Sequence, residues 1–257
     1  MEEHEYKIMY DLEQSYWWFS GKRFLVENNL KRLGFDGLEN RRILDVGSGT
    51  GIILKTLQGF GVSWGAEISR EAIKFLRKRN LERLVCCDVN EPLPFRDNSF
   101  SLVTCLDVLE HVDRDGDLLM ELFRVCEPGG YVFITVPAFH FFWSPHDVAL
   151  HHRRRYLRGQ LVNRMEGVSA KVIKASYYNT VLSLPIAIVR KLKALCAGNE
   201  KAKSDLFFTL PEALNRVLSA VFKLEIYFLN FVDFPFGVSL LVIASKDEEE
   251  KRGCSNP

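Results

Sequence analysis

The chain has 257 residues, 47% of them hydrophobic, and a formal net charge of +1 at pH 7. This length suits one large domain with an added segment, and the apolar content is enough for a sizeable core. The near-neutral charge argues against a duplex-binding protein, because such domains are usually strongly basic, so we expect no nucleic-acid partner. The six cysteines form no CxxC pair, which argues against a disulfide framework or a structural zinc site.

Residues 1–40 form the first predicted unit, a helical segment that is rich in aromatic side chains. Its aromatic face either packs on the core or forms a lid over a bound ligand, because ring faces attract cations. In the second case Tyr16 and Trp17 would touch the substrate, and Arg23 could pair with an anionic group. The first residues lack the basic and apolar segments of a signal peptide, so we expect a cytoplasmic location.

The stretch from Ile43 to Gly51 reads Ile-Leu-Asp-Val-Gly-Ser-Gly-Thr-Gly. Its apolar start predicts a buried parallel strand, and a helical pattern follows from Ile52. Glycines are needed where the backbone turns tightly against a ligand. A dinucleotide fingerprint would read G-x-G-x-x-G, whereas here the order is G-x-G-x-G with Asp45 just upstream. A carboxylate there would repel a pyrophosphate but suits an ammonium group, which favours S-adenosylmethionine over NAD.

Further strands alternate with amphipathic helices along the next ninety residues, which predicts a parallel sheet with helices on both faces. The second strand ends at Glu67, an acid at the interval from Asp45 that suits a ribose diol. The third strand, residues 85–89, contains Asp88, and the fourth leads into Asp107. We expect the ligand at the carboxyl ends of these strands.

This series of motifs resembles the class I S-adenosylmethionine-dependent methyltransferases, in particular a small-molecule "type 11"-like group, over about residues 41–137. The resemblance implies a doubly wound, Rossmann-like α/β fold with a seven-stranded, mostly parallel sheet whose last strand is antiparallel. It also implies S-adenosylmethionine as the cofactor. The positions that match the family's cofactor site are Asp45, Gly47, Ser48, Gly49, Gly51, Glu67, Ile68, Asp88, Val89, Leu106 and Asp107.

The segment from His140 to Tyr156 follows the fifth strand and holds four of the six histidines and three arginines. It is either an exposed basic loop or an acceptor pocket with a histidine base and arginine clamps for an anion. A metal site is the third reading, but the histidines lack a recognised ligand spacing, so we expect none. The candidate bases are His111, His146 and His151. The candidate acceptor-binding residues are Tyr16, Trp17, Arg23, Arg154, Arg155 and Tyr156.

A helical insertion is expected at residues 179–232, between the sixth strand and the last. Its apolar stripe at 211–224 favours a cap over the acceptor pocket. A membrane-surface anchor is the alternative, since a basic run lies at 190–203. The expected division is therefore a lid at 1–40, the cofactor-binding core at 41–178, the cap at 179–232, the last core strand at 233–246, and a disordered tail at 247–257.

The expected function is methylation, at oxygen or carbon, of a small molecule or a lipid- or sugar-linked acceptor. An anionic group and an apolar part would suit the predicted pocket, and peripheral membrane contact is consistent with the insertion. Two alternatives stay open: a catalytically silent binding protein with this fold, and a nicotinamide-dependent oxidoreductase, which Asp45 opposes. The oligomeric state is left open.

Overall fold

The computed structural model of the chain describes residues 3–37, 40–165, 167–168, 170–188 and 210–248. Its strands are β1 (Arg42–Val46), β2 (Val62–Glu67), β3 (Leu84–Cys86), β4 (Phe100–Leu106), β5 (Cys126–Pro137), β6 (Ala170–Tyr178) and β7 (Ser239–Lys246). Its helices are α1 (Glu3–Leu12), α2 (Trp17–Arg32), α3 (Ile52–Leu57), α4 (Arg70–Lys78), α5 (Asp115–Val125), η1 (His140–Phe142), α6 (Pro145–Ala149), α7 (Arg158–Met165) and α9 (Glu212–Phe228).

The strands form one seven-stranded sheet in the order β3-β2-β1-β4-β5-β7-β6. β7 pairs antiparallel with both β5 and β6, and the other pairs are parallel. This confirms the predicted doubly wound α/β fold with its antiparallel last strand. The strand order reverses between β1 and β4, and open α/β sheets bind ligands at that point, outside the carboxyl ends of the strands.

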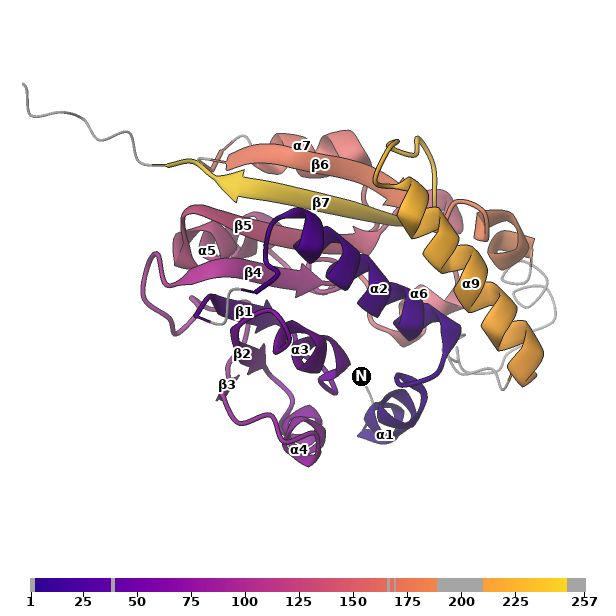
Figure 1. Ribbon diagram of the computed structural model, residues 1–257, viewed down its shortest axis with the longest axis horizontal. Coiled ribbons are helices and arrows are strands. Elements are labelled where there is room, and N and C mark those ends of the chain that lie inside the picture. The colour runs from indigo at the N-terminus through magenta and orange to yellow at the C-terminus, as the bar shows by residue number, and fades with distance from the viewer. Residues whose placement is uncertain (1–2, 38–39, 166, 169, 189–209, 249–257) are drawn as a thin grey trace, which may run out of the picture.

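Helices cover both faces of the sheet (Figure 1). On one face, α2, α3 and α9 pack over Ile43, Leu102 and Phe133. On the other, α5 and α7 pack over Leu44 and Val103. All five strand residues are fully buried. Successive side chains of a strand point to opposite faces, so neighbours such as Ile43 and Leu44 enter different cores.

The N-terminal segment forms two helices, and α1 lies beside α4 (Figure 1). A buried ion pair between Glu13 and Arg79 joins these two parts of the chain. Arg79 also donates from Nε to the Thr50 carbonyl oxygen at 2.9 Å and from Nη2 to the Tyr10 carbonyl oxygen at 3.2 Å. The arginine therefore ties α1 to the glycine-rich loop after β1.

α9, in the second described part of the expected insertion, runs alongside α2 (Figure 1). The Asn215 side chain bridges the two segments, since its Oδ1 accepts from the Trp17 N–H at 2.8 Å and its Nδ2 donates to the Ser15 carbonyl at 2.9 Å. α2 and α9 thus lie side by side on this face of the sheet.

Gly21 allows α2 to approach α9 closely, because a Cβ built at this position would lie 2.0 Å from Cδ1 of the buried Phe222. Replacing Gly21 by Ala should therefore lower the free energy of unfolding by about 1–3 kcal/mol through overpacking. Chemical denaturation measures this change. Gly116→Ala in α5 is the matched control, since nothing lies within 4 Å of its added Cβ, and it should be neutral or stabilising by up to about 1 kcal/mol. Equal behaviour of the two variants would contradict a tight contact at Gly21.

The third strand ends earlier in the structure than the sequence predicts. β3 stops at Cys86, so Asp88 and Val89 follow the strand, and the Asp88 carboxylate accepts the Asn90 N–H at 2.9 Å in the turn. Residues 249–257 of the expected disordered tail and the basic run at 190–203 lie outside the described residues.

Candidate active site

A cavity of about 960 Å³ opens at the carboxyl ends of β1, β2 and β4. Its walls come from the glycine-rich loop, the strand ends, α1, α2, α9 and the segment after β5. The predicted site residues that line it are Tyr16, Trp17, Gly47, Ser48, Gly49, Glu67, Ile68, Asp88, Val89, Leu106, Asp107, His111, His146, His151 and Arg155. The fold thus brings most of the candidate residues to one place.

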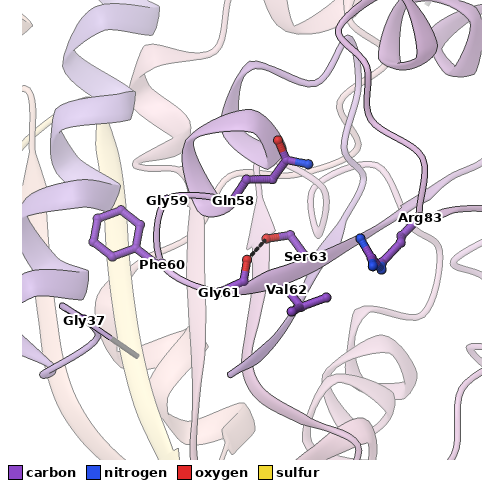
Figure 2. A pocket seen from close by; sticks show the side chains of 8 residues that line it. All are labelled: Gly37, Gln58, Gly59, Phe60, Gly61, Val62, Ser63 and Arg83. Carbon is purple, nitrogen blue, oxygen red and sulfur yellow. Dashed lines mark hydrogen bonds between the residues drawn. The ribbon is translucent and has the colours of Figure 1, made fainter. Parts of the chain in front are cut away.

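A second hollow, of about 550 Å³, lies at the opposite end of β2, near Val62 (Figure 2). Arg83 is the only charged side chain among the eight described residues that line it, and three of these are glycines. These residues offer no grouping of acids, bases or nucleophiles, so the larger cavity is the candidate active site.

The glycine-rich loop is shaped by backbone conformations that favour glycine. Gly47 has a φ of 76°, and a Cβ there would lie 2.3 Å from Cγ2 of Val108. Gly51 has a φ of 95° and packs against Leu76 and Leu81 of the core, so it supports the loop from behind and does not line the cavity. The loop is held to β2 because the Gly47 and Ser48 N–H groups donate to the Ala66 carbonyl.

The Glu67 carboxylate lies at the end of β2 and is 6% exposed. Its Oε2 accepts the Gly49 N–H at 2.8 Å, and its Oε1 accepts the Ser69 N–H at 2.9 Å. Glu67 therefore fixes the glycine-rich loop and the start of α4 while it lines the cavity. Asp88 lines the same wall and is half-buried.

Asp45 lies beneath the glycine-rich loop, 2% exposed, and does not line the cavity. Its Oδ1 accepts the Thr104 hydroxyl at 2.6 Å. Burial raises the pKa of Asp45 to about 6, although the hydrogen bonds from Thr104 and Ser48 oppose the shift. The carboxyl is thus poised to change charge near neutrality.

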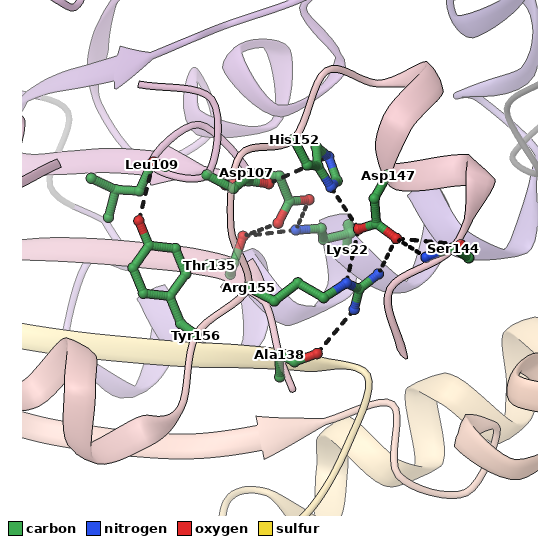
Figure 3. A network of polar contacts seen from close by, with 11 residues as sticks. Lys22, Asp107, Leu109, Thr135, Ala138, Ser144, Asp147, His152, Arg155 and Tyr156 are labelled. Atoms are coloured by element: carbon green, nitrogen blue, oxygen red, sulfur yellow. Dashed lines mark hydrogen bonds and ion pairs between the residues drawn. The ribbon is translucent and has the colours of Figure 1, made fainter. Parts of the chain in front are cut away.

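Lys22 reaches from α2 into the cavity and pairs with Asp107, 2.6 Å from its Oδ2 (Figure 3). The ammonium also donates to the Thr135 hydroxyl at 2.8 Å. Burial alone would lower the pKa of Lys22. The attraction of Asp107, together with the other partners of Lys22, outweighs burial, so the pKa of Lys22 is raised. This pair joins α2 to the ends of β4 and β5.

Asp147 is the centre of a second buried network (Figure 3). Its carboxylate accepts from Arg155 Nε at 2.8 Å, from the Ser144 N–H at 2.9 Å, and lies 2.9 Å from His152 Nδ1. Burial opposes the charge of Asp147, but the hydrogen bonds from His152 and Arg155 hold its pKa below the usual range. Arg155 also donates to the Ala138 carbonyl at 2.9 Å, so its guanidinium has protein partners and is not a free anion clamp.

The histidines of the cavity differ in their surroundings. The His111 and His152 rings lie 4.8 Å apart between centroids. Burial lowers the pKa of His111 to about 4, with a smaller contribution from His152, so its imidazole is neutral at pH 7. Beside them, Glu110 is fully buried, and burial raises the pKa of its carboxyl well above the ordinary value. His146 and His151 line the cavity at other points.

Three of the candidate acceptor-binding residues do not line the cavity. Arg23 donates to the Gln14 carbonyl at 2.7 Å. Arg154 lies 3.1 Å from a carboxylate oxygen of Asp115, and the Tyr156 hydroxyl donates to the same carboxylate at 2.8 Å. Arg154 and Tyr156 thus belong to a structural network behind the cavity.

Sequence reasoning did not select Lys22, Glu110, Asp147 or His152 as site residues. His151 and His152 are neighbours in the sequence, and nothing in the pattern indicates which of them finds a carboxylate partner. Lys22 follows the aromatic run, which gave the lid hypothesis but no reason to single out this lysine. Only the packing of α2 on the sheet brings it to Asp107.

Comparison with known proteins gives matches to methyltransferases. Residues 44–134 match the family model of a methyltransferase domain. A ubiquinone biosynthesis O-methyltransferase from Burkholderia lata is 31% identical over 144 residues, which is 51% of this chain and 62% of the relative. One from Ralstonia nicotianae is 29% identical over 131 residues, covering 46% and 55%. The chain thus spans less than two thirds of the length of these curated relatives.

Solved structures share the fold at lower identity. A methyltransferase in complex with the Haloferax volcanii Trm112 methyltransferase activator has a TM-score of 0.60 at 17% identity, covering 96% of this chain and 94% of that one. A SAM-dependent methyltransferase from Archaeoglobus fulgidus has a TM-score of 0.56 at 23% identity, covering 87% and 94%. Residues 44–134 are therefore similar to the methyltransferase-domain family, and the chain shares the fold of solved methyltransferases.

Proposed function

We propose that the protein transfers the methyl group of S-adenosylmethionine to a hydroxyl oxygen of a small-molecule acceptor. The observation that carries this proposal is that one cavity contains three features: the glycine-rich loop, the acidic strand ends, and a polar cluster that includes Lys22 and His111. The curated relatives are named O-methyltransferases, which favours oxygen over carbon as the methylated atom.

The acidic residues on the loop side fit the proposed cofactor. We assign Glu67 to the ribose hydroxyls and Asp88 to the adenine end, since both line the cavity. Asp45, directly below the loop, would favour the ammonium group of the amino-acid end. When bound, S-adenosylmethionine supplies a methyl group that is already activated by its sulfonium. The protein's own task is therefore to align the acceptor and exclude water.

The acceptor side of the cavity combines this polar cluster with an apolar wall. The wall consists of Trp17, Trp18, Leu182, Leu214 and Leu218. Among the described residues that line the cavity, Lys22 and Arg155 already have carboxylate partners. We therefore propose an acceptor with a hydroxyl group and an apolar part, and the anionic group expected from the sequence is no longer required.

Peripheral membrane contact remains part of the proposal. Among the described residues, no helix is long and apolar enough to cross a membrane. However, α9 exposes Val217 and Leu224, each 58% exposed, and Phe231 beyond its end is 69% exposed. An apolar surface on and beyond the helix that supplies Leu214 and Leu218 to the cavity is consistent with an acceptor that is drawn from a lipid phase.

Glu67→Gln tests the cofactor assignment. It should weaken binding of S-adenosylhomocysteine by about 1.5–3 kcal/mol, a 10- to 150-fold rise in Kd, because it removes a charged hydrogen-bond acceptor. Isothermal titration calorimetry measures the Kd, with NADH as a ligand expected not to bind. Glu82→Gln, on the exposed loop before β3, is the matched control and should bind like wild type.

Failure of the wild-type protein to bind S-adenosylhomocysteine would contradict the proposed function. Binding without methylation of any hydroxylated acceptor, in a screen by mass shift, would favour the catalytically silent alternative. Saturable binding of NADH in place of S-adenosylhomocysteine would support an oxidoreductase.

A further inference from the structure

Glu110 is an acid whose burial the proposed chemistry does not explain. It follows β4 at the carboxyl end, is 0% exposed, and lines the cavity. Neither of its carboxylate oxygens has a hydrogen-bond partner among the described residues. A buried carboxylate without partners is costly, and such groups are usually paired with a cation or coordinate a metal. The nearby cations do not fill this role, since Lys22 pairs with Asp107 and Arg155 with Asp147.

Two imidazoles lie beside this carboxylate. One ligand atom each of Glu110, His111 and His152 can be chosen so that all three lie within 4.8 Å of one another. Metal–ligand bonds of about 2.0–2.2 Å at a tetrahedral ion would place such atoms roughly 3.3 Å apart. Binding of an ion would therefore require side-chain rotations that bring these atoms closer together.

The orientation of His152 also suits a metal ligand. Its Nδ1 lies 2.9 Å from the Asp147 carboxylate, which leaves Nε2 on the side of Glu110, 3.9 Å from Oε1. Metal-binding histidines almost always donate their other ring N–H to a carboxylate or carbonyl. Asp147 is fully buried and is held in turn by Ser144 and Arg155.

The backbone holds the two ligand segments together. The Arg153 N–H donates to the Glu110 carbonyl at 2.8 Å, and Arg153 Nε donates to the His111 carbonyl at 2.8 Å. Arg153 therefore holds its neighbour His152 close to Glu110 and His111. Sequence spacing predicts no metal site, because the ligands are separated by about forty residues and meet only in the fold.

We propose that Glu110, His111 and His152 bind a divalent first-row transition ion at the acceptor end of the cavity, with Asp147 positioning His152. Two imidazoles and one carboxylate suit zinc, whereas magnesium and calcium prefer oxygen ligands. Three protein ligands leave a coordination position open, as in catalytic zinc sites.

The role of the ion rests on the proposed function, whereas its binding does not. An ion here would attract the acceptor hydroxyl and lower the pKa of that group. The hydroxyl proton then leaves to water, and an oxygen lone pair forms the O–CH₃ bond. The S–CH₃ bond breaks with its electron pair remaining on sulfur, so that a sulfonium becomes a neutral thioether.

Metal binding is tested on the full-length protein after dialysis against a chelator. Titration with Zn²⁺, followed by calorimetry, should give one ion per chain, and Co²⁺ should give visible absorption bands of a low-coordinate site. Glu110→Gln and His152→Ala should each weaken Zn²⁺ binding at least 100-fold. Asp147→Asn should weaken it about 10- to 100-fold, the usual effect of losing such a partner.

His140→Ala is the matched control, since this exposed histidine lies beside Trp143 outside the cavity, and it should bind Zn²⁺ like wild type. Glu110→Gln is close in shape to the native residue and places no charge at the buried position, so we expect it to fold. Thermal denaturation checks the folding of every variant. Absence of saturable binding, or wild-type affinity in folded Glu110→Gln and His152→Ala, would overturn the metal site.

The same experiment separates this proposal from the proposed function. The metal-free protein should still bind S-adenosylhomocysteine, because the three ligands lie at the acceptor end of the cavity. Binding of S-adenosylhomocysteine without Zn²⁺ binding would overturn only the metal site. Zn²⁺ binding without S-adenosylhomocysteine binding would contradict only the methyltransferase function.

Discussion

Replacing Arg79 by Met should lower the free energy of unfolding by about 3–5 kcal/mol, because Glu13 would remain buried without its cation. Both side chains are only 2% exposed. The substitution also removes the hydrogen bonds to the Thr50 and Tyr10 carbonyls. Denaturant unfolding measures the loss, and Arg77→Met on the exposed side of α4 is the matched control.

The double variant Arg79→Met with Glu13→Gln separates the two causes. It should recover a large part of the stability, since no buried charge is left. Burial raises the pKa of Glu13 even in the native protein, and loss of the nearby arginine charge should raise it further. The destabilisation in Arg79→Met should therefore shrink as the pH falls and Glu13 takes up a proton. Equal losses in the single and double variants at every pH would contradict this account.

The ion pair between Glu13 and Arg79 also supports one wall of the cavity. Thr50 belongs to the glycine-rich loop, and Glu13 and Met9 line the cavity from the N-terminal segment. Arg79 therefore connects the loop that we assign to the cofactor with the helix that covers it. Looser attachment of α1 should accompany any loss of this pair.

The sequence was sufficient for the sheet because its signals are local. The apolar run Ile43–Val46, the alternating glycines and the strand-to-helix periodicity each lie within a short window, and each specifies one element. Parallel strands then have few ways to connect, since right-handed crossovers place successive helices on the sheet. The antiparallel last strand came from the family resemblance, and the structure confirms it.

The polar interior was less accessible to sequence reasoning because its partners are far apart in the chain. Lys22 in α2 pairs with Asp107 after β4, and Glu13 after α1 pairs with Arg79 after α4. Arg154 and Arg155 are neighbours, yet Arg154 pairs with Asp115 behind the cavity, whereas Arg155 lines the cavity and pairs with Asp147. An extended segment turns successive side chains in different directions, so the cluster of arginines did not indicate a common target.

Asp45 connects stability to the proposed cofactor binding. Its carboxyl is buried, and its pKa is raised from 3.8 to about 6. Between these two values the folded protein holds a proton that the unfolded chain has lost. The contribution of Asp45 to stability is therefore greatest below pH 4 and falls as the pH rises through 6.

Asp45→Asn should consequently raise the free energy of unfolding of the ligand-free protein at pH 8 by up to about 3 kcal/mol, at 1.36 kcal/mol per pKa unit. The asparagine carbonyl can still accept from Thr104, whereas the affinity for S-adenosylhomocysteine should fall at least tenfold as the ammonium loses its counter-charge. Denaturant unfolding at pH 5 and pH 8, with calorimetry at pH 8, measures both effects. Asp36→Asn, on an exposed loop, should change stability by less than about 0.5 kcal/mol. A destabilised Asp45→Asn at pH 8 would show that hydrogen bonds to the ionised carboxylate outweigh its burial, and an unchanged Kd would show that Asp45 supports the loop alone.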